Sequence, residues 1–173
     1  MNRGLLLTMT EPPAPMEEEF NAWYDTEHLQ ERLAIPGFRS ARRWVADVRG
    51  EGKYLATYEL DSPGVLASAE YLARFEGATP WTRRCLGKLV VFRRWACEQM
   101  GDADPNPLAS ALLMVAADAP IRGLALPGAL QIRQFVASAG TPGHVALVEL
   151  SRETRLPAAQ PGWFMRLYRA YGA

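Results

Sequence analysis

Two stretches of this sequence resemble each other, and this similarity constrains the fold more than any other feature. Residues 33–46 (LAIPGFRSARRWVA) and 124–137 (LALPGALQIRQFVA) share Leu-Ala-aliphatic-Pro-Gly, then Arg, an aromatic residue and Val-Ala. Residues 54–60 (YLATYEL) and 144–150 (HVALVEL) also match, and they follow in the same order. Such ordered self-similarity predicts an internal repeat, so the two halves of the chain should have related builds.

The first half contains alternating signals for strands and helices. Apolar and alternating runs predict strands near residues 4–9, 38–46, 54–60 and 88–95. Acidic residues open a helix at Glu17 that should reach about Leu33, before the stop at Pro36-Gly37. Ser62-Pro63 and Thr79-Pro80 carry the cap chemistry of two further helices. This order is that of a ferredoxin-like split βαβ unit.

The second half follows a turn-rich linker at residues 101–107 (GDADPNP) and is incomplete. Residues 116–124 leave no room for a counterpart of the long first helix. Residues 161–171 resemble a terminal helix in composition, and no eighth strand is visible. We therefore predict a complete ferredoxin-like repeat at residues 1–100 and a truncated second repeat with a C-terminal helix at residues 101–173.

The predicted fold class is α+β, with both repeats contributing to an α+β barrel. A ferredoxin-like sheet has one face covered by helices and one bare face that must pack against something. The second half is one partner for that face, and a homodimer is the other.

Composition argues against several classes of partner. The 19 basic and 19 acidic residues cancel, which gives no electrostatic footprint for nucleic acid or an anionic membrane. The first apolar run is too short for a signal peptide, and later runs are too short for a membrane span. Cys85 and Cys97 fit no metal or CxxC spacing, which favours reduced thiols and a cytoplasmic protein.

The stretch EEFNAWYDTEHLQERLAIPGFRSARRW, followed by YLATYEL, resembles the dimeric α+β-barrel superfamily, and in particular its EthD-like and related uncharacterised members. Their first helix carries Phe-Asn-x-Trp-Tyr-x-x-x-His, and their next strand carries Pro-Gly-Phe-x-x-Ala-Arg-Arg-aromatic. The resemblance covers roughly residues 4–97, with Gln30 where members often have proline. The matching positions are Phe20, Asn21, Trp23, Tyr24, His28, Pro36, Gly37, Phe38, Ala41, Arg42, Arg43 and Trp44.

The resemblance implies a pocket between sheet and helices for a small ligand that is often aromatic or carbonyl-bearing. The superfamily includes cofactor-free monooxygenases, muconolactone isomerases, polyketide cyclases and haem enzymes. The reaction therefore does not follow from the fold.

His28 is the main candidate for catalysis. It lies one helical turn after Tyr24, and Asp25 and Glu31 lie three residues away on either side. A neighbouring carboxylate would orient the imidazole and raise its pKa, as a general base requires. We predict His28, Asp25 and Tyr24 as catalytic residues. The structural alternative is a half-exposed histidine that bridges to Asp25 or Glu31 near the helix end.

The predicted substrate-binding residues are mostly aromatic. Alternation places Arg42 and Trp44 on one strand face, where Arg42 could hold an oxyanion; if that face looks into the barrel, Arg43 takes its place. Each could instead serve the core or a salt bridge to Glu59 or Glu27. The full set is Trp23, Arg42, Trp44, Tyr54, Tyr58 and Trp81.

We therefore expect a small-molecule-binding protein without a metal or cofactor. The chain lacks GxGxxG, P-loop, HExxH and nucleophile-elbow motifs, and two histidines offer little for a metal. His144 has no carboxylate near it in sequence and should be structural. One hypothesis is a cofactor-independent isomerase, cyclase, lyase or monooxygenase with His28 as acid or base. The other is a non-catalytic ligand-binding or assembly module.

Overall fold

The computed structural model describes residues 2–158 and 160–172 and contains eight strands. The first half holds β1 (Gly4–Glu11), β2 (Phe38–Val45), β3 (Tyr54–Leu60) and β4 (Val91–Met100). The second half holds β5 (Ala111–Ala117), β6 (Ala129–Ala139), β7 (His144–Leu150) and β8 (Trp163–Ala170).

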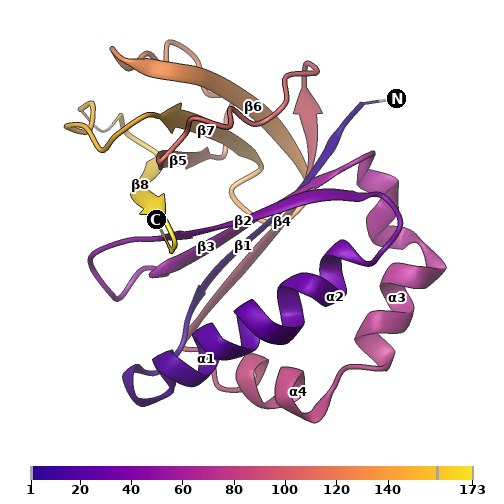
Figure 1. The fold of residues 1–173 in the computed structure, drawn as a ribbon. Helices are drawn as coiled ribbons and strands as arrows, with labels where there is room; N and C mark the ends of the chain where they lie inside the picture. The colour runs from indigo at the N-terminus through magenta and orange to yellow at the C-terminus, as the bar shows by residue number, and fades with distance from the viewer. Residues whose placement is uncertain (1, 159, 173) are drawn as a thin grey trace.

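The strands form one closed antiparallel barrel in the order β1-β3-β2-β8-β5-β7-β6-β4 (Figure 1). β4 pairs with β6 on one side, from Ala96 to Met100. β2 pairs with β8 on the other side, through Trp44 with Ala170 and Val45 with Arg169. Closure removes free strand edges, and it covers the inner sheet face within the chain itself.

All helices of the described residues lie in the first half and pack on the outer face of its sheet (Figure 1). The predicted first helix is confirmed, as α1 (Glu17–Trp23), a π-helical turn (Tyr24–His28) and α2 (Leu29–Leu33) in succession. Short 3₁₀ turns lie at Ala14–Met16 and Pro63–Ala67. α3 (Ala69–Glu76) and α4 (Pro80–Leu86) follow. None of the helices in the described residues is long and apolar enough to cross a membrane.

The predicted fold class is wrong. In place of a ferredoxin-like α+β unit with a degenerate second repeat, the chain forms a single eight-stranded antiparallel β-barrel with few helices. The predicted C-terminal helix at residues 161–171 is also wrong, because that segment is the eighth strand. Phe164 and Tyr168 pack in the barrel core, whereas Trp163 and Met165 pack on the outer face. This alternation has the period of a strand, which composition alone did not reveal.

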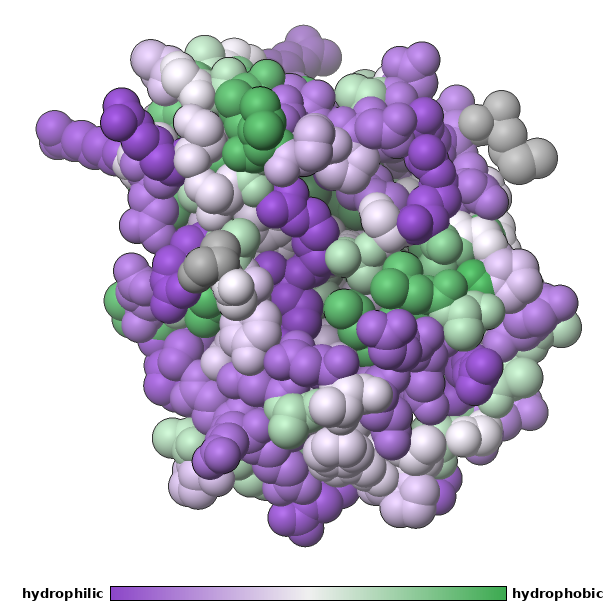
Figure 2. Space-filling model, in the orientation of Figure 1, coloured by the Kyte–Doolittle hydropathy of each residue, from purple (hydrophilic) through white to green (hydrophobic). Residues whose placement is uncertain are grey.

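A segment without helices covers the outer face of the second half. Ile121 and Leu126, in the connection between β5 and β6, are buried against Leu113 and Val148. The expectation that residues 116–124 contain no second copy of the first helix is confirmed. Figure 2 shows one face of the molecule as mainly hydrophilic, with hydrophobic residues gathered in small patches. The internal repeat and the boundary after residue 100 stay predictions.

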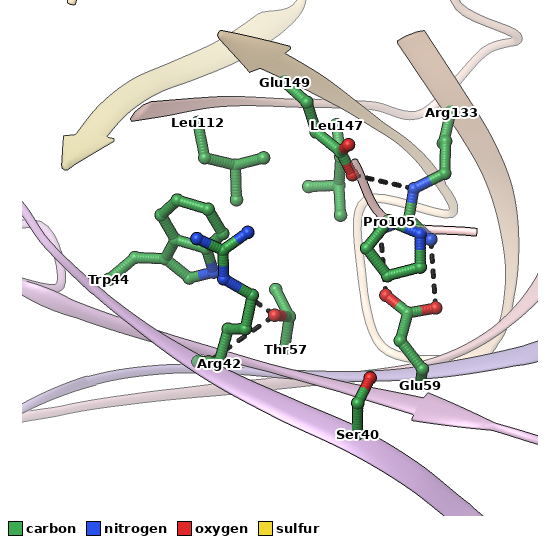
Figure 3. Close-up of a pocket in the computed structure, with 10 residues that line it drawn as sticks. All are labelled: Ser40, Arg42, Trp44, Thr57, Glu59, Pro105, Leu112, Arg133, Leu147 and Glu149. Atoms are coloured by element: carbon green, nitrogen blue, oxygen red, sulfur yellow. Dashed lines mark hydrogen bonds and ion pairs between the residues drawn. The ribbon is translucent and has the colours of Figure 1, made fainter. Parts of the chain in front are cut away.

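The barrel interior contains a buried ion cluster that joins the two halves. Arg133 of β6 donates two hydrogen bonds to Glu59 of β3, at 2.9 and 2.8 Å, and one to Glu149 of β7, at 2.9 Å (Figure 3). The three residues are almost fully buried. A bidentate fork and opposite charges compensate for the loss of water around these groups.

Replacing Arg133 with leucine should destabilise the barrel, because two buried carboxylates would lose their cation. We expect the free energy of unfolding to fall by about 3 to 5 kcal/mol at neutral pH, measured by urea denaturation. The matched variant E59Q/R133L/E149Q removes all three charges together and should lose less stability than R133L. If R133L unfolds like the wild type, the ion cluster does not stabilise the barrel.

Candidate active site between the first helix and the sheet

The helix that carries His28 contains a widened π-helical turn. Tyr24–His28 adopts this turn between the regular helices α1 and α2. Tyr24 and His28 are both buried toward the sheet. π-turns inside α-helices are frequent at functional sites, because the extra residue redirects neighbouring side chains. No pattern in the sequence predicted this turn.

A cavity of about 50 Å³ lies between this helix and the outer face of the sheet. The apolar part of its wall includes two rings that are half exposed and mark its mouth, Phe75 and Phe92, at 52 % and 54 % exposure. The polar part of its wall comes from the helix, β1 and β3 and includes Thr8, Tyr24, His28, Arg32 and Tyr58.

His28 is buried in the cavity wall as a neutral imidazole. Its ring stacks on Trp23 at a centroid distance of 4.3 Å and meets the edge of Tyr24 at 5.0 Å. Its Nδ1 atom is buried and has no hydrogen-bond partner in the part of the chain that the structure describes. Burial, together with the positive charges of Arg32 and Arg43, lowers the pKa of His28 to about 3. Between pH 5 and 8 the imidazole is therefore uncharged, and its unprotonated nitrogen can accept a hydrogen bond or, in a reaction, a proton.

Arg32 places a second unpaired nitrogen at the same cavity. It is 6 % exposed, and none of the described residues forms a hydrogen bond with its Nη1 atom. Its guanidinium lies over the rings of Tyr71 and Phe75, at 5.6 and 5.3 Å from their centroids. Among residues 2–158 and 160–172, no carboxylate forms an ion pair with Arg32. A buried cation without a carboxylate is unusual, because burial of charge is normally compensated.

Three hydroxyl groups line the cavity beside these nitrogens. The Tyr58 hydroxyl donates a long hydrogen bond of 3.4 Å to the Tyr24 hydroxyl. The Tyr24 hydroxyl also lies 3.4 Å from Thr8 Oγ1. Burial, together with the neighbouring Tyr24, raises the pKa of Tyr58 well above its usual value. The Tyr58 hydroxyl therefore stays protonated at neutral pH. All three hydroxyls can donate a hydrogen bond to a bound oxygen atom.

The predicted partnership of Asp25 with His28 does not occur. Asp25 Oδ1 accepts a hydrogen bond from Arg43 Nη1 at 2.6 Å, and Asp25 lies outside the cavity wall. The π-turn separates the two side chains, with His28 turned toward the sheet and Asp25 toward Arg43. Tyr24, by contrast, does line the cavity with His28.

Arg42 and Trp44 point into the barrel (Figure 3). Neither residue lines the cavity beside His28. Arg42 donates to the Ala109 carbonyl oxygen at 2.6 Å, and its guanidinium lies 4.4 Å from the Trp44 ring centroid. The interior space beside them is about 10 Å³, which is room for about one water molecule. As the strand alternation allowed, Arg43 takes the helix-facing position instead.

Of the other predicted binding residues, one lines the cavity and the others lie outside its wall. Tyr58 lines the cavity, whereas Tyr54 donates to Glu17 at 2.6 Å and lies outside it. Burial raises the pKa of Tyr54 to about 12. Trp23 supports His28 from behind and donates from Nε1 to Thr82 at 3.0 Å. Trp81 packs on the same hydrophobic cluster without lining the cavity.

Arg32 and Thr8 are among the cavity residues that sequence reasoning missed, as are Tyr71, Phe75, Phe92 and Arg94. Arg32 follows His28 by four positions and Tyr24 by eight, which places all three on one side of the helix. That spacing was a usable signal. Thr8 sits in an apolar strand, and its proximity to Tyr24 depends on tertiary packing that no local pattern encodes.

Other hollows are larger but less distinctive. One of about 300 Å³ lies at the surface beside His144 and Ile121. Another, of about 260 Å³, lies beside Arg166, whose terminal nitrogens contact Glu51 and the Val48 carbonyl. The His28 cavity is distinguished by two buried unpaired nitrogens in one wall. In the described part of the chain, no three His, Cys, Asp or Glu side chains come close enough to hold a metal ion.

Comparison with known proteins reveals similarity of structure only. No protein-family model matches the sequence, and no curated protein is significantly similar to it. An anthrone oxidase-like protein has a TM-score of 0.62, covering 98 % of this chain and 91 % of its own at 9 % identity. A candidate monooxygenase from Lactobacillus acidophilus NCFM has a TM-score of 0.50, covering 86 % and 76 % at 8 % identity.

These likenesses establish the fold. At these identities the similarity does not place the chain in the dimeric α+β-barrel superfamily, so that resemblance stays a prediction. Assignment to the EthD-like proteins stays a prediction. At so low a sequence identity, the activity of one protein cannot be assigned to the other, because one fold hosts many reactions.

The neutral state of His28 should make stability depend on pH. Its pKa is about 3 in the folded protein and near its ordinary value of 6.5 when unfolded, so the unfolded chain binds the extra proton between these values. The contribution of His28 to the free energy of unfolding should therefore decline as the pH falls from 6.5 toward 3, by up to about 1.4 kcal/mol per pH unit.

Urea denaturation of the wild type and H28Q between pH 7 and pH 4 measures this slope. H28Q should lose less stability on acidification than the wild type. H144Q removes the other histidine, which lies away from the cavity, and is the matched control. Parallel profiles for the wild type and H28Q would contradict burial of a neutral imidazole.

Proposed function

We propose that the cavity beside His28 binds a small aromatic or carbonyl compound, and that the protein is a cofactor-independent enzyme. One observation carries this proposal. Two buried nitrogens that have no partner among the described residues, His28 Nδ1 and Arg32 Nη1, belong to side chains of the same cavity wall. Unsatisfied buried polar atoms are costly, and they commonly mark a place where a ligand supplies the missing partner.

The chemistry that suits this wall is proton transfer. A neutral imidazole can take a proton from an acidic C–H or O–H group of a bound phenol, enol or ketone. The conjugate anion would lie beside Arg32 and the hydroxyls of Tyr24 and Tyr58, which stabilise negative oxygen. The same anion offsets the positive charges that now oppose protonation of His28. His28 would thus act as the acid or base, without help from Asp25.

The cavity also restricts how a ligand can sit. Its volume of about 50 Å³ holds a polar head group rather than a whole ring system. The rest of an aromatic ligand would lie at the mouth, where Phe75 and Phe92 expose their rings. Aromatic contacts of this kind are favourable in offset or edge-on geometry. Only the reacting oxygen or carbon would need to reach His28.

The structural neighbours suggest a reaction class. One is described as anthrone oxidase-like and the other as a candidate monooxygenase. A deprotonated phenol or enol is the electron-rich species that oxygenation without a cofactor requires, and it is also the intermediate of an isomerisation or cyclisation. Proton abstraction by His28 is common to these reactions, so the proposal commits to that step.

A non-catalytic ligand-binding module is the second candidate. The observation that favours it is the absence of an orienting carboxylate at His28, since Asp25 pairs with Arg43. An imidazole with a pKa of about 3 is also a weak base before a ligand binds. In this case His28 and Arg32 would recognise the ligand without transferring a proton.

Solvent exchange distinguishes the two candidates. Phenols, naphthols and cyclic 1,3-diketones that raise the melting temperature would be incubated in D₂O, and deuterium incorporation at carbon would be followed by NMR. The wild type should accelerate exchange, and H28Q should reduce that acceleration by about 100-fold or more. H144Q is the matched control and should behave like the wild type. Binding without His28-dependent exchange would establish the non-catalytic candidate instead.

A further inference from the structure

Arg32 differs from the other buried arginines of this protein. Arg133 pairs with Glu59 and Glu149 inside the barrel, and Arg43 pairs with Asp25 at the helix. Arg32 is buried to the same degree but forms no ion pair among the described residues. Its positive charge therefore lacks the compensation that the same fold provides elsewhere.

The cavity wall around Arg32 contains no negative charge. Its charged members are Arg32 and Arg94, and none of its lining residues is Asp or Glu. Arg94 is already engaged, because its Nη2 donates to the Tyr71 hydroxyl at 3.0 Å. A neutral ligand would leave the positive charge of Arg32 uncompensated, whereas an anionic ligand would compensate it.

The guanidinium of Arg32 is held in place before any ligand arrives. The rings of Tyr71 and Phe75 contact it from α3, while its Nη1 stays free of hydrogen bonds. A planar guanidinium fixed against aromatic rings suits a planar oxyanion, because two N–H groups can face two oxygens.

We propose that the ligand of this cavity carries an oxyanion, either a carboxylate or an ionised enol or phenol, which pairs with Arg32 while its apolar body lies against Phe75 and Phe92. This inference rests on the proposed function in using the same cavity. It goes further in naming the charge of the ligand and the residue that selects it.

Ligand charge should be linked to the protonation of His28. Arg32 lies four residues after His28 and opposes a second positive charge in the cavity, as does Arg43 from β2. An anion beside Arg32 offsets part of this electrostatic repulsion, so its binding should raise the pKa of His28 and favour protonation of the imidazole. The other titratable or charged groups in this wall are Tyr24 on the same helix, Tyr58 of β3, Tyr71 of α3 and Arg94 of β4.

Benzoate and benzamide test the inference, because they have nearly the same shape and differ in charge. Isothermal titration calorimetry of the wild type should show benzoate binding tighter than benzamide by about ten-fold or more, the usual strength of a hydrogen-bonded charge. R32M should lower the affinity for benzoate to that for benzamide, and R32K should keep part of the preference for benzoate. R74M, which changes an exposed arginine of α3 outside the cavity wall, should keep all of it.

Protonation is measured in the same experiment. Benzoate titrations near pH 5, in buffers with different ionisation enthalpies, should show proton uptake by the wild type and less uptake by H28Q. Melting temperatures of R32M and R32K establish that the variants are folded at the temperature of the titration.

The outcomes separate this inference from the proposed function. Equal affinity for benzoate and benzamide, or a preference that survives in R32M, would overturn the oxyanion inference and leave the cavity as a site for neutral ligands. Failure of both probes, while a phenol binds equally well to the wild type and to R32M, would overturn it too. If no compound of the whole panel binds, the inference and the proposed function fail together.

Discussion

Arg43 joins the closure of the barrel to the candidate site. Its carbonyl oxygen accepts from Tyr171 N at 3.0 Å, just beyond the short β2–β8 seam, and its guanidinium lies 3.9 Å from the Tyr171 ring centroid. The same guanidinium donates to Asp25 and to Asn21, both at 2.6 Å, and lies over Tyr24. One buried cation thus ties the end of the chain to the π-helical turn. Without closure, the turn that aims His28 at the sheet would lose this support.

Strand alternation separates two kinds of buried charge. On β2, Arg42 faces the barrel interior and Arg43 faces the helices. Inside the barrel, Arg133 satisfies both carboxylates and leaves room for about one water molecule. Outside, between helix and sheet, Arg32 and His28 remain without partners around a larger space. The barrel interior therefore serves stability, and the unsatisfied groups lie where a ligand can reach them.

Local patterns predicted much of the first half. The helix from Glu17 to Leu33, the stop at Pro36-Gly37 and the strand at residues 54–60 follow from capping, periodicity and β propensity, which are properties of neighbouring residues. The candidate site was predicted in part for the same reason, because Tyr24 and His28 share a helix face. An α+β barrel of two repeats was predicted, but the single closed sheet of eight strands was not, because strand partners far apart in sequence are determined by tertiary packing.

The pairing of charged groups was the least predictable feature. Asp25 is three residues from His28, yet it binds Arg43 across the helix-sheet interface, because the π-turn and the alternation of β2 bring those two together. Arg133 likewise takes its carboxylates from β3 and β7. Sequence proximity favours a pair only when both side chains point the same way. Arg32 is distinguished by the lack of an ion-pair partner among the described residues. Such a lack can be recognised only when all neighbours in space are known. For this reason the residue that best indicates a ligand was not predicted from the sequence.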